Sequence, residues 1–283
     1  MPRTRPTLLA ALAVAGLLGA STVGTVAQES ITIDAADVPV TIDGDPSDWA
    51  DVEPTTVGLV QLDLGLLPPE QADEIEFGPI DPIEVQFRVA NDADNIYMLV
   101  EVPTAYDYVA DDHNLSPAIA VQAKIVPEAS THMGSEEADL FVSTGMVDIW
   151  HWELDCGPGE LSGSQPIEDK PAGDDACNMD DEFSTTPEMR EDDGGGDDPN
   201  DTAENSLVGS WSHSAAELGG DGTWVFEMAR PLSTGDAQDA NWEPGGAAEL
   251  VLAWWDPNET AEGWTDAGHL TNAYDGWITV NLK

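Results

Sequence analysis

Basic residues are scarce in this chain of 283 residues, which has 8 Lys and Arg against 56 Asp and Glu and a formal net charge of −48. Nucleic acids and anionic membrane surfaces both need a basic patch on their partner, so the composition argues against a nucleic-acid partner and disfavours an anionic membrane surface. Repulsion among so many negative charges destabilises a compact fold unless salt screens it. At 1 M ionic strength the Debye length, the distance over which charges interact, falls to about 3 Å. The acidity therefore indicates a protein of a salt-loving organism.

Cysteine is almost absent, with Cys156 and Cys177 as the two residues of this type. In an exported chain, two cysteines across a loop most simply form one disulfide. A metal-binding pair is the weaker alternative, because no CxxC or nearby histidine completes a ligand set. The chain also lacks a CxxCH motif, which excludes covalent attachment of a c-type haem.

Catalytic motifs are missing as well: the sequence contains no GxSxG, no HExxH and no phosphate-binding glycine loop. Its carboxylates are so numerous that no pair can be singled out as a glycosidase dyad. The histidines lack the spacing of zinc ligands; they are His113, His132, His151, His213 and His269. We therefore predict a non-catalytic protein.

Long apolar runs are limited to one, at residues 8–19, which is too short to span a membrane comfortably. Arg3 and Arg5 precede it, and the small residues at 25–27 supply a cleavage site. We predict a signal peptide at 1–27, with an uncleaved anchor as the alternative. The mature chain is expected to be exported and soluble, at the outer face of the cytoplasmic membrane or in a periplasm-like space.

Strand-like runs dominate the remainder, and no long stretch has a helical period. The pattern predicts a single all-β domain at 28–283, an antiparallel β-sandwich of immunoglobulin-like or jelly-roll-like type, with one short helix at 69–72. The expected strands are 31–33, 38–42, 56–62, 83–89, 96–102, 118–125, 140–154, 206–211, 223–229, 249–255 and 276–281.

Residues 155–204 break this pattern, because they are rich in Asp, Gly, Pro and Ser. A loop of this length is either functional or disordered. We interpret it as an acidic, partly disordered insertion. A specific cation site is the alternative, although the spacing of an EF-hand is absent.

The run VDIWHW at 147–152 is unusual for a strand, because Trp and His both carry N–H groups that need partners when buried. Six segments then occur in order: VTIDGDPSDWADV, HMGS, VDIWHW, GTWVFEMARPLSTGD, ELVLAWWDPNETAEGW and GWITVNL. Together they resemble the haem-binding gamma-subunit family typified by ethylbenzene dehydrogenase. That family serves type II dimethyl-sulfoxide-reductase-like molybdenum enzymes.

The resemblance implies a β-sandwich that binds one non-covalent haem b through axial methionine and lysine ligands. The family methionine falls on Met133, with the adjacent His132 as an alternative. No lysine occupies the expected interval, where His269 stands instead, so the implied pair is Met133 and His269.

Further residues of the implied haem site are Trp150 and Trp152, which would form pocket walls or ordinary core. Arg230 would bind a haem propionate or a neighbouring carboxylate. Because side chains alternate along a strand, His151 is expected on the face opposite the two tryptophans, as a structural hydrogen-bonding residue.

The function implied by the resemblance is electron transfer between a molybdenum and iron–sulfur oxidoreductase and the respiratory chain. Its partners would be a molybdopterin catalytic subunit and an iron–sulfur subunit, with the membrane reached only indirectly through a partner. The alternative is a family 9-like carbohydrate-binding module of a halophile surface protein, because TIDGDPSDW also resembles the start of those modules. A surface β-domain without a ligand is the third possibility.

Overall fold

The structure, a computed structural model, describes residues 30–61, 80–109, 112–136, 139–143, 145–154, 158, 162–163, 179–184, 197–198, 205–264 and 268–283. The predicted signal peptide, the predicted helix at 69–72, and Cys156 and Cys177 lie outside these residues and stay predictions. Within the described ranges, no helix combines the length and apolarity needed to cross a membrane.

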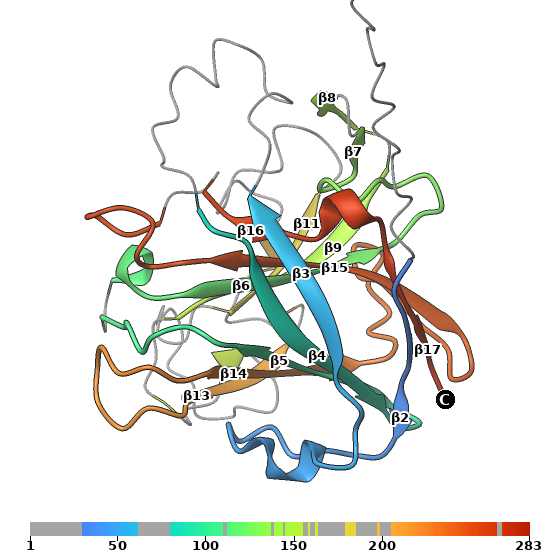
Figure 1. Cartoon of the computed structure of the whole chain (residues 1–283). Coiled ribbons are helices and arrows are strands. Elements are labelled where there is room, and N and C mark those ends of the chain that lie inside the picture. The colour runs from blue at the N-terminus through green and yellow to red at the C-terminus, as the bar shows by residue number, and fades with distance from the viewer. Residues whose placement is uncertain are drawn as a thin grey trace, which may run out of the picture.

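Two layers of strands form the molecule (Figure 1). The lower layer consists of β10 (Ser162–Gly163), β13 (Val208–His213), β14 (Trp224–Pro231), β5 (Asn95–Val102), β4 (Ile83–Asn91) and β3 (Thr55–Gln61), with β2 (Ala36–Asp37) beside β4. The upper layer consists of β16 (Leu270–Thr271), β15 (Ala247–Trp255), β6 (Ala118–Lys124), β9 (Val147–Glu153), β11 (Met179–Ser184) and β12 (Asp197–Asp198), with β17 (Ile278–Asn281) and β1 (Thr32–Asp34) beside β15. All pairs are antiparallel except β1–β17 and β2–β4.

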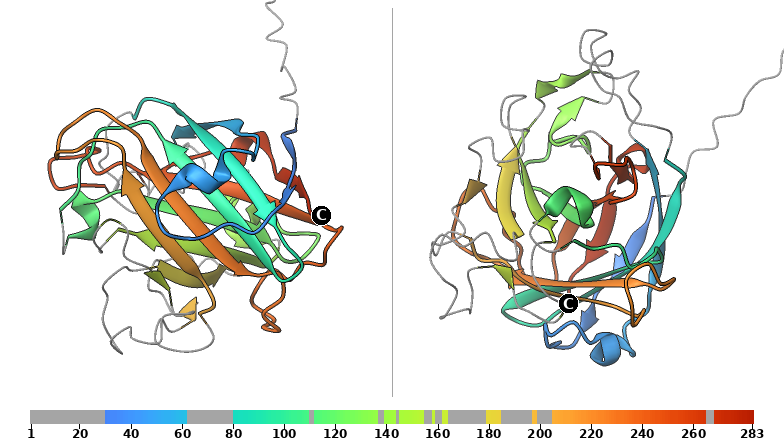
Figure 2. Two further views of the ribbon diagram at one scale, coloured as in Figure 1. Left: turned by 90° about the horizontal axis from the view of Figure 1, so that it is seen from below. Right: turned by 90° about the vertical axis from the view of Figure 1, so that its left-hand side faces the viewer.

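The layers join at one edge through β3, which pairs with β4 below and with β16 above. Figure 1 shows β3 crossing from the lower layer to the upper one, and the right-hand view of Figure 2 shows both layers from the side. The described residues contain no α-helix, only the short 3₁₀ helices η1 (Pro46–Trp49), η3 (His113–Leu115) and η5 (Ala273–Asp275). The prediction of an all-β, mainly antiparallel sandwich is therefore confirmed.

The main core lies between the layers and follows from the two-residue period of the strands. In β9, Trp150 and Trp152 point into this core. In β14, Trp224, Phe226 and Met228 do the same from the opposite layer. The ring of Trp152 meets that of Phe226 edge-on at 5.7 Å, so aromatic contacts link the two layers directly.

Residues 38–42 are not a strand, contrary to the sequence prediction. Val38, Val40 and Ile42 instead pack against a cluster on the outer face of the lower layer, together with Trp49. These residues alternate in burial because the segment packs on the sheet without pairing with it. Packing on a sheet and pairing within one both bury every second residue, so the sequence pattern is the same.

The predicted strand 140–154 is in fact two strands, β8 (Asp139–Ser143) and β9. β8 pairs with β7 (Ser135–Glu136), whereas β9 pairs with β6. Gly145 lies between them, where a Cβ atom would stand 2.7 Å from the backbone nitrogen of Ala129. This close approach of two backbones marks the end of one strand and the start of the next.

The region 155–204 also differs from the expected loop, because it contains β10, β11 and β12. β11 pairs with β9 along six residues, from Met179 opposite Trp152 to Ser184 opposite Val147. Without β11, β9 would expose a row of unpaired backbone N–H and C=O groups, and strand pairing removes that edge.

Candidate functional site

The outer face of the upper layer has a floor of small residues. Ala120 of β6 lies opposite Ala253 of β15 on one side and opposite His151 of β9 on the other. One step along the same face, Ala118 lies between Trp255 and Glu153. Directly opposed residues of antiparallel strands share a face, so these side chains form adjacent rows. The alanines leave room for larger side chains to lie over the strands.

Trp255 is the centre of the aromatic layer over this floor. Its ring lies 5.0 Å from that of His151, 4.8 Å from that of His269 and 6.0 Å from that of Trp264. Trp264 is fixed by its indole N–H, which donates to the Ser116 carbonyl oxygen at 2.7 Å. Both tryptophans are largely buried, so they are rigid supports for the residues around them.

The rim of this layer is partly exposed. Tyr274 of η5 contacts the buried His132 at 4.9 Å between ring centres, and Trp277 has the Lys124 ammonium 5.4 Å from its ring. Lys124 also forms an ion pair with Glu249 at 3.0 Å. In Figure 1, η5 and the β7–β8 hairpin lie on this outer side of the upper layer. We call the set the aromatic face; it comprises His132, Met133, His151, Trp255, Trp264, His269, Tyr274 and Trp277.

Gln122 connects β6 to the turn that carries Met133. Its Oε1 accepts a hydrogen bond from the Met133 backbone N–H at 2.9 Å, and its Nε2 donates to the Thr131 carbonyl oxygen at 3.1 Å. Gln122 is 6% exposed, so both bonds form in a largely water-excluded setting. Met133 is partly exposed and packs against the aromatic face.

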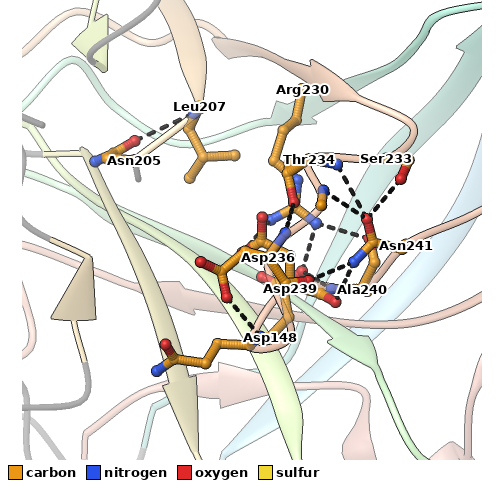
Figure 3. A network of polar contacts seen from close by, with 12 residues as sticks. Asp148, Asn205, Leu207, Arg230, Ser233, Thr234, Asp236, Asp239, Ala240 and Asn241 are labelled. Carbon is orange, nitrogen blue, oxygen red and sulfur yellow. Dashed lines mark hydrogen bonds and ion pairs between the residues drawn. The ribbon is translucent and has the colours of Figure 1, made fainter. Parts of the chain in front are cut away.

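A separate polar network lies inside the main core around Arg230 (Figure 3). The guanidinium of Arg230 donates to Asp148 Oδ2 at 2.5 Å and to the Ala240 carbonyl oxygen at 3.0 Å, and its Nη1 lies 3.5 Å from Asp239 Oδ1. Its Cζ is 4.9 Å from the centre of the Trp150 ring. Burial raises the pKa of Asp148, and the charge of Arg230 opposes that rise. This network holds β14 against β9 across the sandwich.

A third polar centre, Glu227, faces outward from the lower layer and is fully buried beneath the chain segment before β3. Its carboxylate accepts hydrogen bonds from the backbone N–H groups of Asp43 at 3.0 Å and Gly44 at 2.7 Å, and from the Trp49 indole at 2.8 Å. Burial raises the pKa of Glu227 to about 7, and these donors oppose that rise. The DGDPSDW motif therefore has a structural role, because its hydrogen bonds to Glu227 hold the segment before β3 against β14.

The five residues assigned to a haem site fall on two sides of the upper layer. Trp150, Trp152 and Arg230 are in the core, and Arg230 binds carboxylates. Met133 and His269 belong to the aromatic face, so the upper sheet lies between them and the three core residues. The five residues therefore do not surround a single ligand.

The alternation expected for β9 is confirmed, because His151 points outward while Trp150 and Trp152 point inward. Sequence reasoning missed Gln122, Trp264, Tyr274, Trp277 and Glu227. One signal was present for Gln122, a lone amide in the apolar run AIAVQA at the start of β6.

Comparison with known proteins found no matching protein family and no similar curated sequence. A protein from Bacteroides uniformis described as carbohydrate-binding is similar in structure, with a TM-score of 0.46 and 10% identity over 90% of this chain and 100% of that one. A family 9 carbohydrate-binding module from Caldicellulosiruptor kristjanssonii is similar in its cellotriose complex (TM-score 0.41, 11% identity, 89% and 93% of the two chains). Its glucose complex is also similar (TM-score 0.40, 12% identity, 89% and 95%). At these values the similarities assign no ligand to this chain.

The predicted membership of the haem-binding gamma-subunit family is wrong, and so is the electron-transfer function drawn from it. No family matches, and the similar structures are described as carbohydrate-binding. In the part of the chain that the structure describes, no group of three His, Cys, Asp or Glu side chains is placed to hold a metal ion. Haem b itself, the axial roles of Met133 and His269, and the two subunit partners stay predictions.

Proposed function

We propose that this chain is a non-catalytic carbohydrate-binding protein and that the aromatic face binds neutral sugars. The observation that carries the proposal is that the partly exposed rings of His269, Tyr274 and Trp277 lie on one sheet face with the largely buried Trp255 and Trp264, above the alanines of β6 and β15. Binding sites for small ligands are lined mainly by apolar and aromatic side chains, with a few polar groups that fix orientation. Here the imidazoles of His132 and His269 supply polar edges beside the rings.

The local charges of the aromatic face favour neutral sugars. Uronic acids and sulfated glycans need a cation in direct contact, and Lys124 beside Trp277 is already paired with Glu249. A neutral oligosaccharide needs no such cation and presents C–H groups to the aromatic rings. The proposed ligand class is therefore neutral oligosaccharide.

The experiment is isothermal titration calorimetry of the protein, folded in high salt, with neutral oligosaccharides of glucose, xylose, mannose and galactose. We expect at least one to bind with a Kd on the order of 1 μM to 1 mM, equivalent to about −8 to −4 kcal/mol. Intrinsic fluorescence should change too, because Trp255 and Trp277 belong to the face. Absence of binding across the panel would contradict the proposal.

A matched pair of variants locates the site. Tyr274→Ala removes a partly exposed ring from the aromatic face, whereas Tyr108→Ala removes a partly exposed ring that packs against Trp211 at 5.1 Å. We expect the first variant to weaken binding about tenfold and the second to leave it unchanged. Equal binding by Tyr274→Ala and the wild type would place the ligand elsewhere.

We also propose export of the chain by the segment 1–27. The basic residues, apolar run and small residues that support this are features of the sequence. N-terminal sequencing of protein recovered from the extracytoplasmic fraction is expected to begin at Gln28. A cell-retained protein that begins at Met1 would contradict export by cleavage.

A further inference from the structure

The backbone at Met133 is strained. Its φ of 50° makes it the one non-glycine residue with positive φ among the residues described. This left-handed conformation brings the Cβ atom too close to the following carbonyl oxygen, and Gly, Asn or Asp normally occupy such positions. Gly134, the next residue, also has positive φ, at 76°. A side chain selected for the turn alone would not be methionine.

The surroundings maintain this conformation. Gln122 holds the turn on both sides of His132 through its bonds to the Thr131 carbonyl and the Met133 N–H. The Gly134 N–H closes the turn on the Ser130 carbonyl oxygen at 3.3 Å. Gln122 projects from the central strand β6, which is paired on both sides. The strained turn is therefore anchored to a strand that is paired along both of its edges.

Packing accounts for only part of the Met133 side chain. The side chain packs against the aromatic face and is also partly exposed, whereas the neighbouring Ala129 and His132 are buried. Strained residues concentrate at ligand-binding sites, where a fixed side-chain position compensates for the energy of the conformation. The flexible thioether of Met133 lies beside aromatic rings, where it adapts to the apolar surface of a bound molecule.

We propose that Met133 is a ligand-contacting residue of the aromatic face and that Gln122 positions it, an inference that rests on the proposed function. The Met133 side chain packs against the C–H surface of a neutral sugar, next to the rings that stack on it. Gln122 does not touch the sugar and acts through the turn.

The test uses the full chain in high salt and the member of the neutral panel that the wild type binds most tightly. Met133→Ala keeps the strain and removes the side chain, whereas Met133→Gly removes both. At most sites glycine destabilises relative to alanine. Here we expect Met133→Gly to unfold at a higher urea concentration than Met133→Ala, and both to bind about tenfold more weakly than the wild type.

Gln122→Ala separates positioning from contact. It should weaken binding in the wild type, and it should cause no further loss in Met133→Gly, because the side chain that it positions is absent there. Full additivity of the two losses overturns the positioning role. Wild-type affinity in Met133→Gly overturns the contact role while the proposed function stands. A wild type that binds no neutral sugar overturns both proposals.

Discussion

Arg230 is the residue on which the inner packing of the two layers depends. Its guanidinium is completely buried and lies among the Asp148 carboxylate, the Ala240 carbonyl oxygen and the Trp150 ring. The Ala240 N–H also donates to Asp148, at 2.7 Å, so the loop after β14 closes on the same carboxylate. A buried pair of this kind is sensitive to the loss of one partner, because the remaining charge cannot reach water.

We predict that Arg230→Leu lowers the free energy of unfolding by about 3–5 kcal/mol, because it leaves Asp148 buried without its cation. The double variant Arg230→Leu/Asp148→Leu should recover only part of that loss, because the buried Asp239, 3.5 Å from Arg230, still lacks its cation. Urea unfolding in high salt measures both values. A single variant within about 1 kcal/mol of the wild type would show that the pair is not a structural requirement.

Among the elements, the segment from Asp43 to Trp49 covers the outer face of the lower layer. Asp45 is the N-cap of η1, and its side chain accepts the Ser47 N–H at 3.0 Å. Gly44 has a φ of 79°, and a Cβ atom there would lie 2.9 Å from the Trp211 carbonyl oxygen. The segment therefore docks closely on β13 and β14, with Glu227 beneath it.

Glu227 should make this docking depend on pH. Its pKa is about 7 in the folded chain and near 4.5 when unfolded, so the folded state binds the extra proton between these values. Its contribution is complete below pH 4.5 and is lost as the pH rises through 7, by about 3 kcal/mol. We expect the stability of the wild type relative to Glu227→Gln to fall over this range.

Urea unfolding of the wild type and Glu227→Gln at pH 5, 6, 7 and 8 gives this difference. The comparison cancels the titration of the other acidic residues, which the two proteins share. A constant difference between the two across the series would show that Glu227 keeps one protonation state. Asp43 is the neighbouring carboxylate whose charge raises the pKa of Glu227 further.

The loop that carries Trp264 depends on Gly263. Its φ is 96°, and a Cβ atom there would lie 1.9 Å from the Asn114 carbonyl oxygen. Gly263→Ala should lower stability by more than the ~1–2 kcal/mol of a left-handed alanine, because the loop must also move. We expect it to shift Trp264 and to weaken sugar binding as well.

Gly235→Ala is the matched control, since its φ is 85° and nothing lies within 4 Å of the added Cβ. Gly235→Ala should lower the free energy of unfolding only by the cost of alanine at positive φ, and it should bind sugar as tightly as the wild type. Thermal unfolding and titration of the two variants side by side check the prediction. Equal losses in both would mean that the contact with Asn114 adjusts without cost.

At the scale of the whole molecule, the net charge of −48 opposes the closed two-layer fold. Because β3 connects the two layers, the like charges on their outer surfaces repel one another within one continuous sheet. We predict that the thermal midpoint rises steadily between about 0.1 and 3 M NaCl, as the screening length shortens from about 10 Å to below 3 Å. Circular dichroism at both salt concentrations measures it.

Charge reversal at exposed positions provides the control. Asp51, Glu53 and Glu243 are exposed, and changing all three to Lys reduces the negative charge without altering a buried side chain. The triple variant should need less salt to reach the same midpoint. An unchanged salt requirement would show that the salt effect comes from hydrophobic burial rather than from screening.

The all-β class, most strand positions and the opposite faces of Trp150 and His151 could be predicted from the sequence, because a two-residue period depends on local chain geometry alone. It did not separate 38–42 from a true strand, because packing on a sheet and pairing within it bury the same residues. Contacts between distant segments were decided by the tertiary structure. Glu227 meets Gly44 across 183 residues, and the turn with the left-handed Met133 is held by Gln122 of β6. The resemblance that implied a haem site joined Arg230 to Met133, yet the fold separates them: Arg230 of β14 binds Asp148 in the core, whereas Met133 lies in a turn on the outer face of the upper layer.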